Sequence, residues 1–243
     1  MSEKSQISTT PVALVTGGSR GLGRALTLEL ARQGWTVITD ARDSAALART
    51  ERDGSDRVIA VPGDIADPLH RAQLVDATRT AGTLGLVVAN AGALGPSPLP
   101  RLAEVDLGAL DTTMAINTTA QLGLAQAVLP LLRDPGGTIA FITSDAAVEA
   151  YPGWGVYGAS KAALEAIARV LAVEEPAVSV LVIDPGDLRT EMHQAAFPGE
   201  DISDRAAPEQ VAPQVVRLLV SDIASGRHRV SDVADPSPPV AAS

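Results

Sequence analysis

Short apolar runs alternate along the chain with longer segments in which apolar residues recur every three to four positions. Short apolar runs bounded by turn residues are typical of buried strands, and the longer spacing indicates amphipathic helices. The predicted strands lie at residues 12–16, 36–39, 58–61, 86–89, 138–142 and 178–183. Strands that alternate with helices favour a doubly wound parallel sheet with helices on both faces. We therefore predict an α/β fold of the Rossmann type.

The ends of this pattern set the expected limits of a single domain. Residues 1–10 form a polar arm, residues 11–233 the Rossmann domain, and residues 234–243 a proline-rich tail that we expect to be disordered. A chain of 243 residues is ordinary for one α/β domain. No apolar run reaches about 18 residues and no signal region opens the chain, so we expect a soluble, cytoplasmic protein.

Composition narrows the functional classes. Hydrophobic residues make up 46% of the chain but aromatic residues only 2%, which predicts a core of aliphatic side chains. The net charge of −10 argues against nucleic acid or an anionic membrane as the main partner. Cysteine is absent, and His70, His193 and His228 lack the spacing of metal ligands, so neither thiol chemistry nor a metal site is expected.

Residues 138–161 join a strand, a loop and the start of a helix, and they carry three candidate catalytic side chains. Ser144 follows the strand, while Tyr157 and Lys161 are four residues apart in the helix. This spacing puts them on one helical face, roughly 5–6 Å apart at Cβ. A nearby ammonium favours phenolate and should lower the pKa of Tyr157 from about 10. Tyr157 is then a candidate acid or base for carbonyl chemistry, with Ser144 as donor to the substrate oxygen. Alone, however, Tyr-x-x-x-Lys is also a common surface pair.

The glycine-rich segment 17–23 has two functional interpretations. Closely spaced glycines between a strand and a helix let the backbone approach a pyrophosphate. The same letters match the G-x-S-x-G elbow of α/β-hydrolases, in which Ser19 would be the nucleophile and His193 or His228 a partner. The hydrolase elbow belongs deeper in the sheet, whereas only one strand precedes Ser19, so we prefer the dinucleotide interpretation. A non-catalytic regulator that binds a dinucleotide is a third alternative.

Several motifs in the expected order resemble the short-chain dehydrogenase/reductase family over residues 11–192. They are Thr16–Gly23 for its T-G-x-x-x-G-x-G loop, Asp64 beside the adenine, Asn90-Ala91-Gly92 for its N-A-G motif, the tetrad Asn117, Ser144, Tyr157 and Lys161, and Pro185–Thr190 for P-G-x-x-x-T. The resemblance implies hydride transfer between a nicotinamide cofactor and a carbonyl or secondary alcohol. By this resemblance, Tyr157 transfers the proton and Ser144 holds the substrate oxygen. Lys161 binds the nicotinamide ribose, and Asn117 holds a water molecule. Asn117 and Asp64 also fit structural roles, as a helix residue bonded to backbone and as a turn residue.

The resemblance and the loop positions together predict two sets of binding residues. Expected to bind cofactor are Gly17, Ser19, Arg20, Gly21, Leu22, Gly23, Arg42, Asp64, Ile65, Asn90, Ala91, Gly92, Tyr157, Lys161, Pro185, Gly186, Leu188 and Thr190. Expected in the substrate pocket are Leu94, Ser144, Val148, Tyr151, Trp154, Met192, His193 and Phe197. Residues 191–204 could form a lid. The predicted substrate is a partly apolar small-molecule ketone or alcohol.

Cofactor choice depends on the register of the second strand. Asp40 lies 19 residues after Gly21, near the spacing at which an acid binds the ribose 2′-hydroxyl of NAD. The family's NAD-selecting acid usually comes seven residues after the position of Gly34, which here is Ala41. A one-residue offset on a strand should aim Asp40 away from the ribose. Arg42 and Arg20 are bases suited to a 2′-phosphate, so NADP(H) is favoured while NAD(H) stays possible.

The two long helices predict assembly. Residues 104–132 and 157–174 carry apolar side chains over more than one face, which requires a second buried side. We predict a homodimer through these helices, as in related enzymes. Many relatives also end with a V-D-G-G signature that supports a tetramer, but residues 225–230 here read SGRHRV. Dimer and tetramer therefore both stay open.

Overall fold

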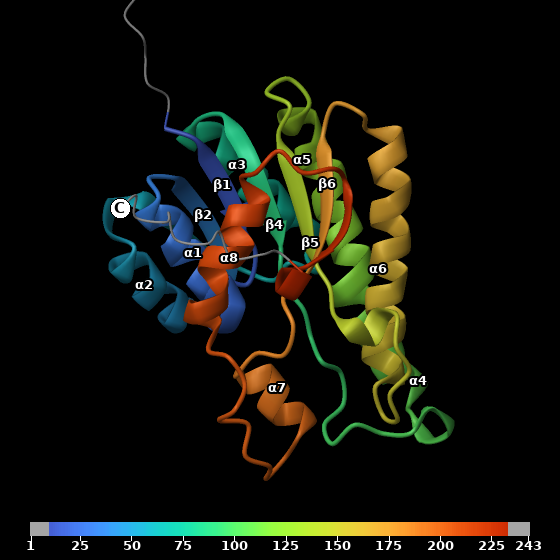
Figure 1. The fold of residues 1–243 in the computed structure, drawn as a ribbon. Coiled ribbons are helices and arrows are strands. Elements are labelled where there is room, and N and C mark those ends of the chain that lie inside the picture. The colour runs from blue at the N-terminus through green and yellow to red at the C-terminus, as the bar shows by residue number, and fades with distance from the viewer. Residues whose placement is uncertain (1–9, 233–243) are drawn as a thin grey trace, which may run out of the picture.

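The computed structural model describes residues 10–232, which form a parallel sheet between two layers of helices (Figure 1). The predicted tail, and the predicted arm apart from Thr10, lie outside the described residues. The strands are β1 Val12–Val15, β2 Thr36–Ala41, β3 Val58–Pro62, β4 Leu84–Ala89, β5 Thr138–Ile142, β6 Ser179–Asp184 and β7 Gly226–Arg229. Their order is β3-β2-β1-β4-β5-β6-β7, and every pairing is parallel. The predicted fold class is confirmed.

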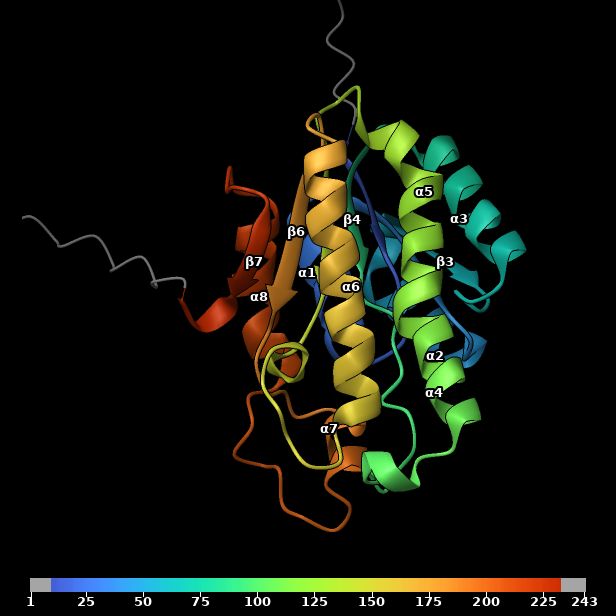
Figure 2. The same ribbon diagram turned by 90° about the vertical axis from the view of Figure 1, so that its right-hand side faces the viewer.

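The helices cover both faces of this sheet. They are α1 Gly21–Arg32, α2 Ser44–Asp53, α3 Pro68–Ala81, α4 Leu107–Met114, α5 Ala120–Leu132, α6 Gly155–Glu174, α7 Glu191–Ala196 and α8 Pro208–Leu219. Figure 2 shows α3, α5 and α6 along one face, with α8 on the other, where it packs against α1. None of these helices, within the described part of the chain, has the length and apolarity needed to cross a membrane.

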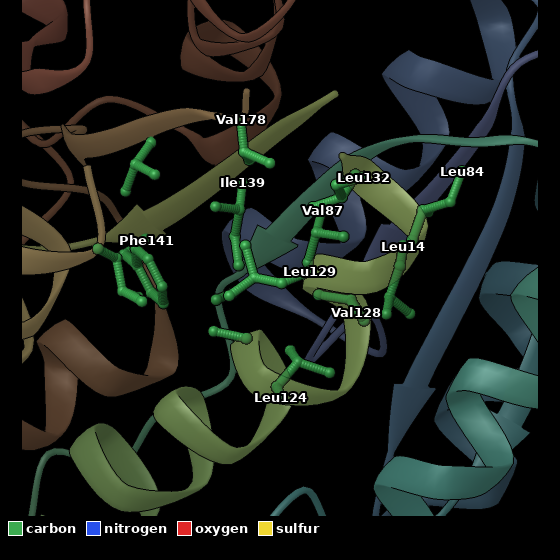
Figure 3. Packing of buried hydrophobic residues seen from close by; sticks show 14 of the residues in the cluster. Leu14, Leu84, Val87, Leu124, Val128, Leu129, Leu132, Ile139, Phe141 and Val178 are labelled. Atoms are coloured by element: carbon green, nitrogen blue, oxygen red, sulfur yellow. The ribbon is translucent and has the colours of Figure 1, made fainter. Parts of the chain in front are cut away.

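Alternating side chains of the strands build two separate cores. In β1, Val12 and Leu14 face the layer of α3, α5 and α6, whereas Ala13 and Val15 face α1 and α8. Figure 3 shows the first core, in which Phe141 of β5 and Leu124 of α5 are completely buried. Burial on both faces explains why these strands are nearly continuous apolar runs.

The structure departs from the sequence-based elements at the first of the two long helices and at the C-terminal edge. The single helix expected over residues 104–132 is α4 and α5 joined by a π-helical turn at Ala115–Thr119. The elements that had not been predicted include α8 and the strand β7, whose sequence Gly-Arg-His-Arg has no apolar pattern. β7 forms because its backbone pairs with the free edge of β6, with Arg227 opposite Val182.

The sheet places the candidate functional residues at one edge. The chain crosses from β3 back to β4 on the far side of β1, which creates a switch point between β1 and β4. In open α/β sheets, ligands bind at the carboxyl ends of the strands beside such a point. Here the loops that follow β1, β3, β4, β5 and β6 line one cleft of about 1280 Å³.

Candidate active site

The glycine loop between β1 and α1 forms a cradle for an anion. Gly17 and Gly21 have φ of 75° and 55°, which side chains other than glycine rarely adopt. A Cβ atom on Gly23 would lie 2.2 Å from the carbonyl oxygen of Gly17, so only glycine allows this close approach. No side chain caps the N-terminus of α1. Its free N–H groups and the helix dipole therefore favour a phosphate, and the loop fits a dinucleotide pyrophosphate.

Hydrogen bonds hold the loop after β4 against this cradle. The hydroxyl oxygen of Thr16 accepts from the backbone N–H groups of Asn90 and Ala91, each at 3.0 Å. The side chain of Asn90 donates to the carbonyl oxygen of Thr16 at 2.8 Å. The N-A-G segment is thus built into the floor of the cleft by contacts to β1.

Asn117 lies completely buried in the π-helical turn, behind the cleft lining. Its amide accepts from the N–H of Ala93 and donates to the Ala93 carbonyl oxygen, both at 2.8 Å, and it also donates to Ser160 Oγ at 2.9 Å. These contacts anchor the loop after β4 to α6. The side chain thus has the structural role considered above, and its role toward a water molecule stays a prediction.

Tyr157 and Lys161 lie buried on one face of α6, with the Lys161 ammonium 5.6 Å from the centre of the tyrosine ring. The ammonium donates to the carbonyl oxygen of Ile142 at 2.9 Å. Burial raises the pKa of Tyr157, and the charges of Asp145 and Asp184 raise it further. Burial lowers the pKa of Lys161 to about 8. The pKa of Tyr157 thus shifts opposite to our expectation, because desolvation and two carboxylates outweigh the ammonium.

Ser144 lies two residues after the end of β5 and lines the same cleft as Tyr157. Its hydroxyl donates to Asp145 Oδ1 at 2.8 Å and accepts from the N–H of Ala146 at 3.2 Å. Its backbone carbonyl oxygen accepts from Arg227 Nη2 at 3.3 Å. The sequence predicted neither Asp145 as the partner of the serine hydroxyl nor Arg227 as the partner of its backbone carbonyl oxygen.

Arg227 of β7 belongs to a network of buried charges behind Ser144. Its guanidinium donates to Asp184 at 2.8 Å and to Glu165 at 3.1 Å, and both carboxylates are almost fully buried. Thr143 donates to the same oxygen of Glu165 at 2.7 Å. One feature of the sequence could have indicated this network: Glu165 is a charged residue on the buried face of the helix that carries Tyr157. Its partner is 62 residues away, and the polar strand β7 was not recognised.

The region expected to select the cofactor contains one buried acid and two arginines. Asp40 is 1% exposed, and its carboxylate accepts from the N–H of Gly17 at 2.8 Å and contacts His70 Nε2 at 3.0 Å. The hydrogen bond to Asp40 raises the pKa of His70, although burial opposes this shift. Arg42 is exposed at the cleft, and Arg20 forms an ion pair with Glu191 of α7.

Nearly all of the predicted binding residues line the cleft. All eighteen positions expected to bind cofactor do so, and so do the expected substrate residues Leu94, Ser144, Tyr151, Trp154, Met192, His193 and Phe197. Val148 does not, since it lies in the loop after β5 with 59% of its surface exposed. Asp64 Oδ1 also accepts from the N–H of Ala66, which is the turn contact considered above.

The substrate half of the cleft is walled by aromatic rings and by α7. Trp154 lies edge-on to Tyr157 with ring centres 5.8 Å apart, and 6.0 Å from Phe197. The expected lid over residues 191–204 contains α7, which Thr190 caps by accepting from the N–H of His193. The hydrolase alternative finds no support, because in the described structure no histidine is hydrogen-bonded to Ser19.

Comparison with known proteins identifies relatives of this chain in sequence and in fold. The short chain dehydrogenase profile matches residues 11–201. Benzil reductase ((S)-benzoin forming) of Saccharomyces cerevisiae is 32% identical over 95% of this chain and 87% of its own length. Sepiapterin reductase of Mus musculus is 33% identical over 76% of this chain and 77% of its own. A short chain dehydrogenase structure from Escherichia coli complexed with NADPH is 30% identical, with a TM-score of 0.82, and covers 90% of this chain and 96% of its own.

The chain belongs to the short-chain dehydrogenase/reductase family and is an oxidoreductase. The sequence-based assignment to this family is confirmed.

Proposed function

We propose that this protein is an NADP(H)-dependent carbonyl reductase that interconverts a small-molecule ketone and its secondary alcohol. The observation that carries the proposal is the convergence, in one cleft, of Ser144, Tyr157 and Lys161 with an uncapped helix N-terminus in a glycine cradle. The relatives named as reductases of benzil and sepiapterin support the reaction class. The cradle and the cleft volume fit a dinucleotide, which would supply the hydride to the carbonyl carbon.

The tetrad residues have distinct tasks in this proposal. Tyr157 gives its phenolic proton to the carbonyl oxygen, and Ser144 donates a hydrogen bond to the same oxygen. The raised pKa of Tyr157 keeps the phenol protonated and therefore suits reduction. Lys161 is held by the carbonyl oxygen of Ile142. Its positive charge stabilises the phenolate that Tyr157 becomes after giving up its proton, and its ammonium binds ribose hydroxyls. Asn117 positions this assembly by fixing α6 to the loop after β4.

NADP(H) is the proposed cofactor because of the charges near the adenosine end. Arg42 is exposed in the cleft, where it can meet a 2′-phosphate, and Asp40 is buried among internal partners. The solved relative complexed with NADPH supports this choice.

The test combines binding and turnover. NADPH fluorescence should change on mixing with the protein, and a panel of ketones should then cause NADPH absorbance to fall. Absence of NADPH binding would refute the proposal. Binding without turnover of any ketone or alcohol would favour the non-catalytic alternative.

We further propose a homodimer through α4, α5 and α6. Val170 and Val173 of α6 and Leu107 of α4 are 54%, 81% and 70% exposed, although they are apolar. Leu124 and Val128 belong to the helical segment 104–132 that was predicted for the interface, but they are buried in the core. Light scattering at micromolar concentration should give about twice the 24.9 kDa mass of one chain. A mass near 24.9 kDa would contradict the dimer.

A further inference from the structure

Asp145 presents a carboxylate in the substrate half of the cleft, directly beside Ser144. Its Oδ1 accepts from the Ser144 hydroxyl and from the N–H of Ala146, both at 2.8 Å, and its Oδ2 accepts from the Tyr151 hydroxyl at 3.0 Å. Within residues 10–232, no basic side chain forms an ion pair with Asp145. The carboxylate is thus hydrogen-bonded by neutral groups only.

Two of the other acids that line the cleft have cationic partners. Asp187 pairs with Arg205 at 3.4 Å, and Glu191 pairs with Arg20. Glu149, just outside the cleft lining, lies 3.6 Å from Arg229. Asp145 therefore contributes a negative charge to the substrate half that has no ion-pair partner in the described structure, although the charge of Arg229 acts on it from a greater distance.

Tyr151 cannot satisfy Asp145 fully. Its hydroxyl lies 2.8 Å from Glu149 and 3.0 Å from Asp145, yet it has a single proton to donate. Burial works to raise the pKa of Asp145, but the hydrogen bonds from Ser144, Tyr151 and Ala146, together with the charge of Arg229, lower it on balance. The carboxylate is therefore ionised at neutral pH and has unused acceptor capacity toward the cleft.

The aromatic residues of the chain are concentrated around this charge. The protein has two tryptophans, two tyrosines and two phenylalanines, and four of these six line the cleft: Tyr151, Trp154, Tyr157 and Phe197. Aromatic faces next to a carboxylate attract an organic cation through both charge and ring quadrupoles. A purely apolar ketone would pack against the rings but would offer no hydrogen-bond donor to the side of Asp145 that faces the cleft.

We propose that Asp145 selects an amino ketone, by binding an ammonium group on the carbon next to the carbonyl. This inference rests on the proposed reductase function and names its substrate class. Ser144 Oγ and Asp145 Oδ1 are only 2.8 Å apart. A substrate whose oxygen is at Ser144 can therefore bring an adjacent ammonium to Asp145, where a charge-assisted hydrogen bond forms.

Ammonium binding also changes what Ser144 can do. A serine hydroxyl has one proton, and that proton is directed at Asp145. When the ammonium takes its place on Oδ1, the proton of Ser144 becomes available to the carbonyl oxygen. A ketone without an amine must instead compete with Asp145 for that proton. The same group thus gives affinity and prepares the serine for the reaction.

The reaction balances without any further reactant. The carbonyl carbon gains the hydride of the reduced nicotinamide, the oxygen gains the proton of Tyr157, and the product is an amino alcohol with an unchanged ammonium. The reduced cofactor is oxidised in the same step.

The test uses two substrates of the same shape, 2-amino-1-phenylethanone and propiophenone, in which an ammonium replaces a methyl group. The wild type should show a higher kcat/KM for the amine, and Asp145→Asn should lower the ratio of the two values about ten- to a hundredfold. Glu149→Gln is the matched control, because Glu149 has Arg229 as its own partner. It should change the ratio by no more than about twofold.

A second measurement does not depend on turnover. Binding of 2-phenylethylammonium, which cannot be reduced, is measured by calorimetry with NADP⁺ present. It should weaken about tenfold or more in Asp145→Asn, while NADPH binding stays unchanged. Equal losses for both ketones, a wild type without preference for the amine, or undiminished ammonium binding would overturn the proposal. Failure of the reductase function itself would instead appear as absent NADPH binding or as no turnover of either ketone.

Discussion

The carboxylate of Asp40 points inward and contacts His70 Nε2 at 3.0 Å, although Asp40 lies on the strand that leads to the cofactor cleft. Its other oxygen accepts from the N–H of Gly17 in the glycine loop. Both oxygens thus have internal partners, and the side chain is 1% exposed. An acid in this arrangement stabilises the loop and is poorly placed to bind a ribose hydroxyl. Arg42, two residues further along the chain, is exposed and lines the cleft.

Replacement of Arg42 should therefore alter cofactor preference. Arg42→Ala should weaken NADPH binding about ten- to a hundredfold, because it removes charge-assisted hydrogen bonds to the 2′-phosphate. NADH binding should change little, and Arg52→Ala, on the exposed side of α2, is the control. Fluorescence titrations with both cofactors measure the effect. A wild type that prefers NADH, and loses that preference in Asp40→Ala, would show that the acid and not Arg42 selects the cofactor.

Loss of the Tyr157 hydroxyl should affect the chemical step alone. Tyr157→Phe keeps the ring that packs edge-on against Trp154 but removes the proton donor. General acid catalysis typically contributes about 10²–10⁴-fold, so kcat should fall at least about a hundredfold. NADPH affinity, measured by fluorescence, should remain close to that of the wild type. A kcat near the wild-type value would exclude Tyr157 from proton transfer.

Lys161 should make stability depend on alkaline pH. Burial lowers its pKa from 10.5 to about 8, so between these values the unfolded chain holds a proton that the folded chain has lost. The free energy of unfolding should therefore rise with pH, by about 1.4 kcal/mol per unit at most for this group. Urea unfolding at about pH 8 and about pH 9.5 should show a rise in the wild type that is smaller in Lys161→Met. Equal pH dependence in both proteins would contradict the lowered pKa.

Arg227 should link the C-terminal strand to the active site. Arg227→Met leaves Glu165 without its close cation and removes a donor from the carbonyl oxygen of Ser144. Breaking a buried pair costs about 3–5 kcal/mol, and the partial exposure of Arg227 reduces the expected loss to about 2–3 kcal/mol. Urea unfolding measures the loss, and kcat should fall as Ser144 shifts. Arg229→Met, which removes a second contact of Asp184 and the ion pair with Glu149 but none with Glu165 or Ser144, should have a smaller effect on both. A stable, fully active Arg227→Met protein would rule out this link.

Local sequence patterns were sufficient for six of the seven strands in the described sheet, for the glycine loop and for the family. The apolar runs predict six of the strands because burial on both faces demands aliphatic side chains regardless of distant neighbours. The glycines of the loop are required by backbone geometry within a few residues, as the positive φ of Gly17 illustrates. Four-residue spacing places Tyr157 and Lys161 on one face of any helix that contains them.

Tertiary structure decided the features that depend on partners distant in the chain. The strand β7 has a polar sequence and exists because β6 offers a free edge and Asp184 offers a charge to Arg227. Strand register had already predicted that Asp40 points away from the ribose, but its partner His70 on α3, 30 residues away, was decided by the fold. Desolvation set the directions of the pKa shifts of Tyr157 and Lys161, since burial is a property of the folded chain and not of the motif. The motif thus predicts the type of reaction, while the packing around the motif determines the pKa values of its side chains.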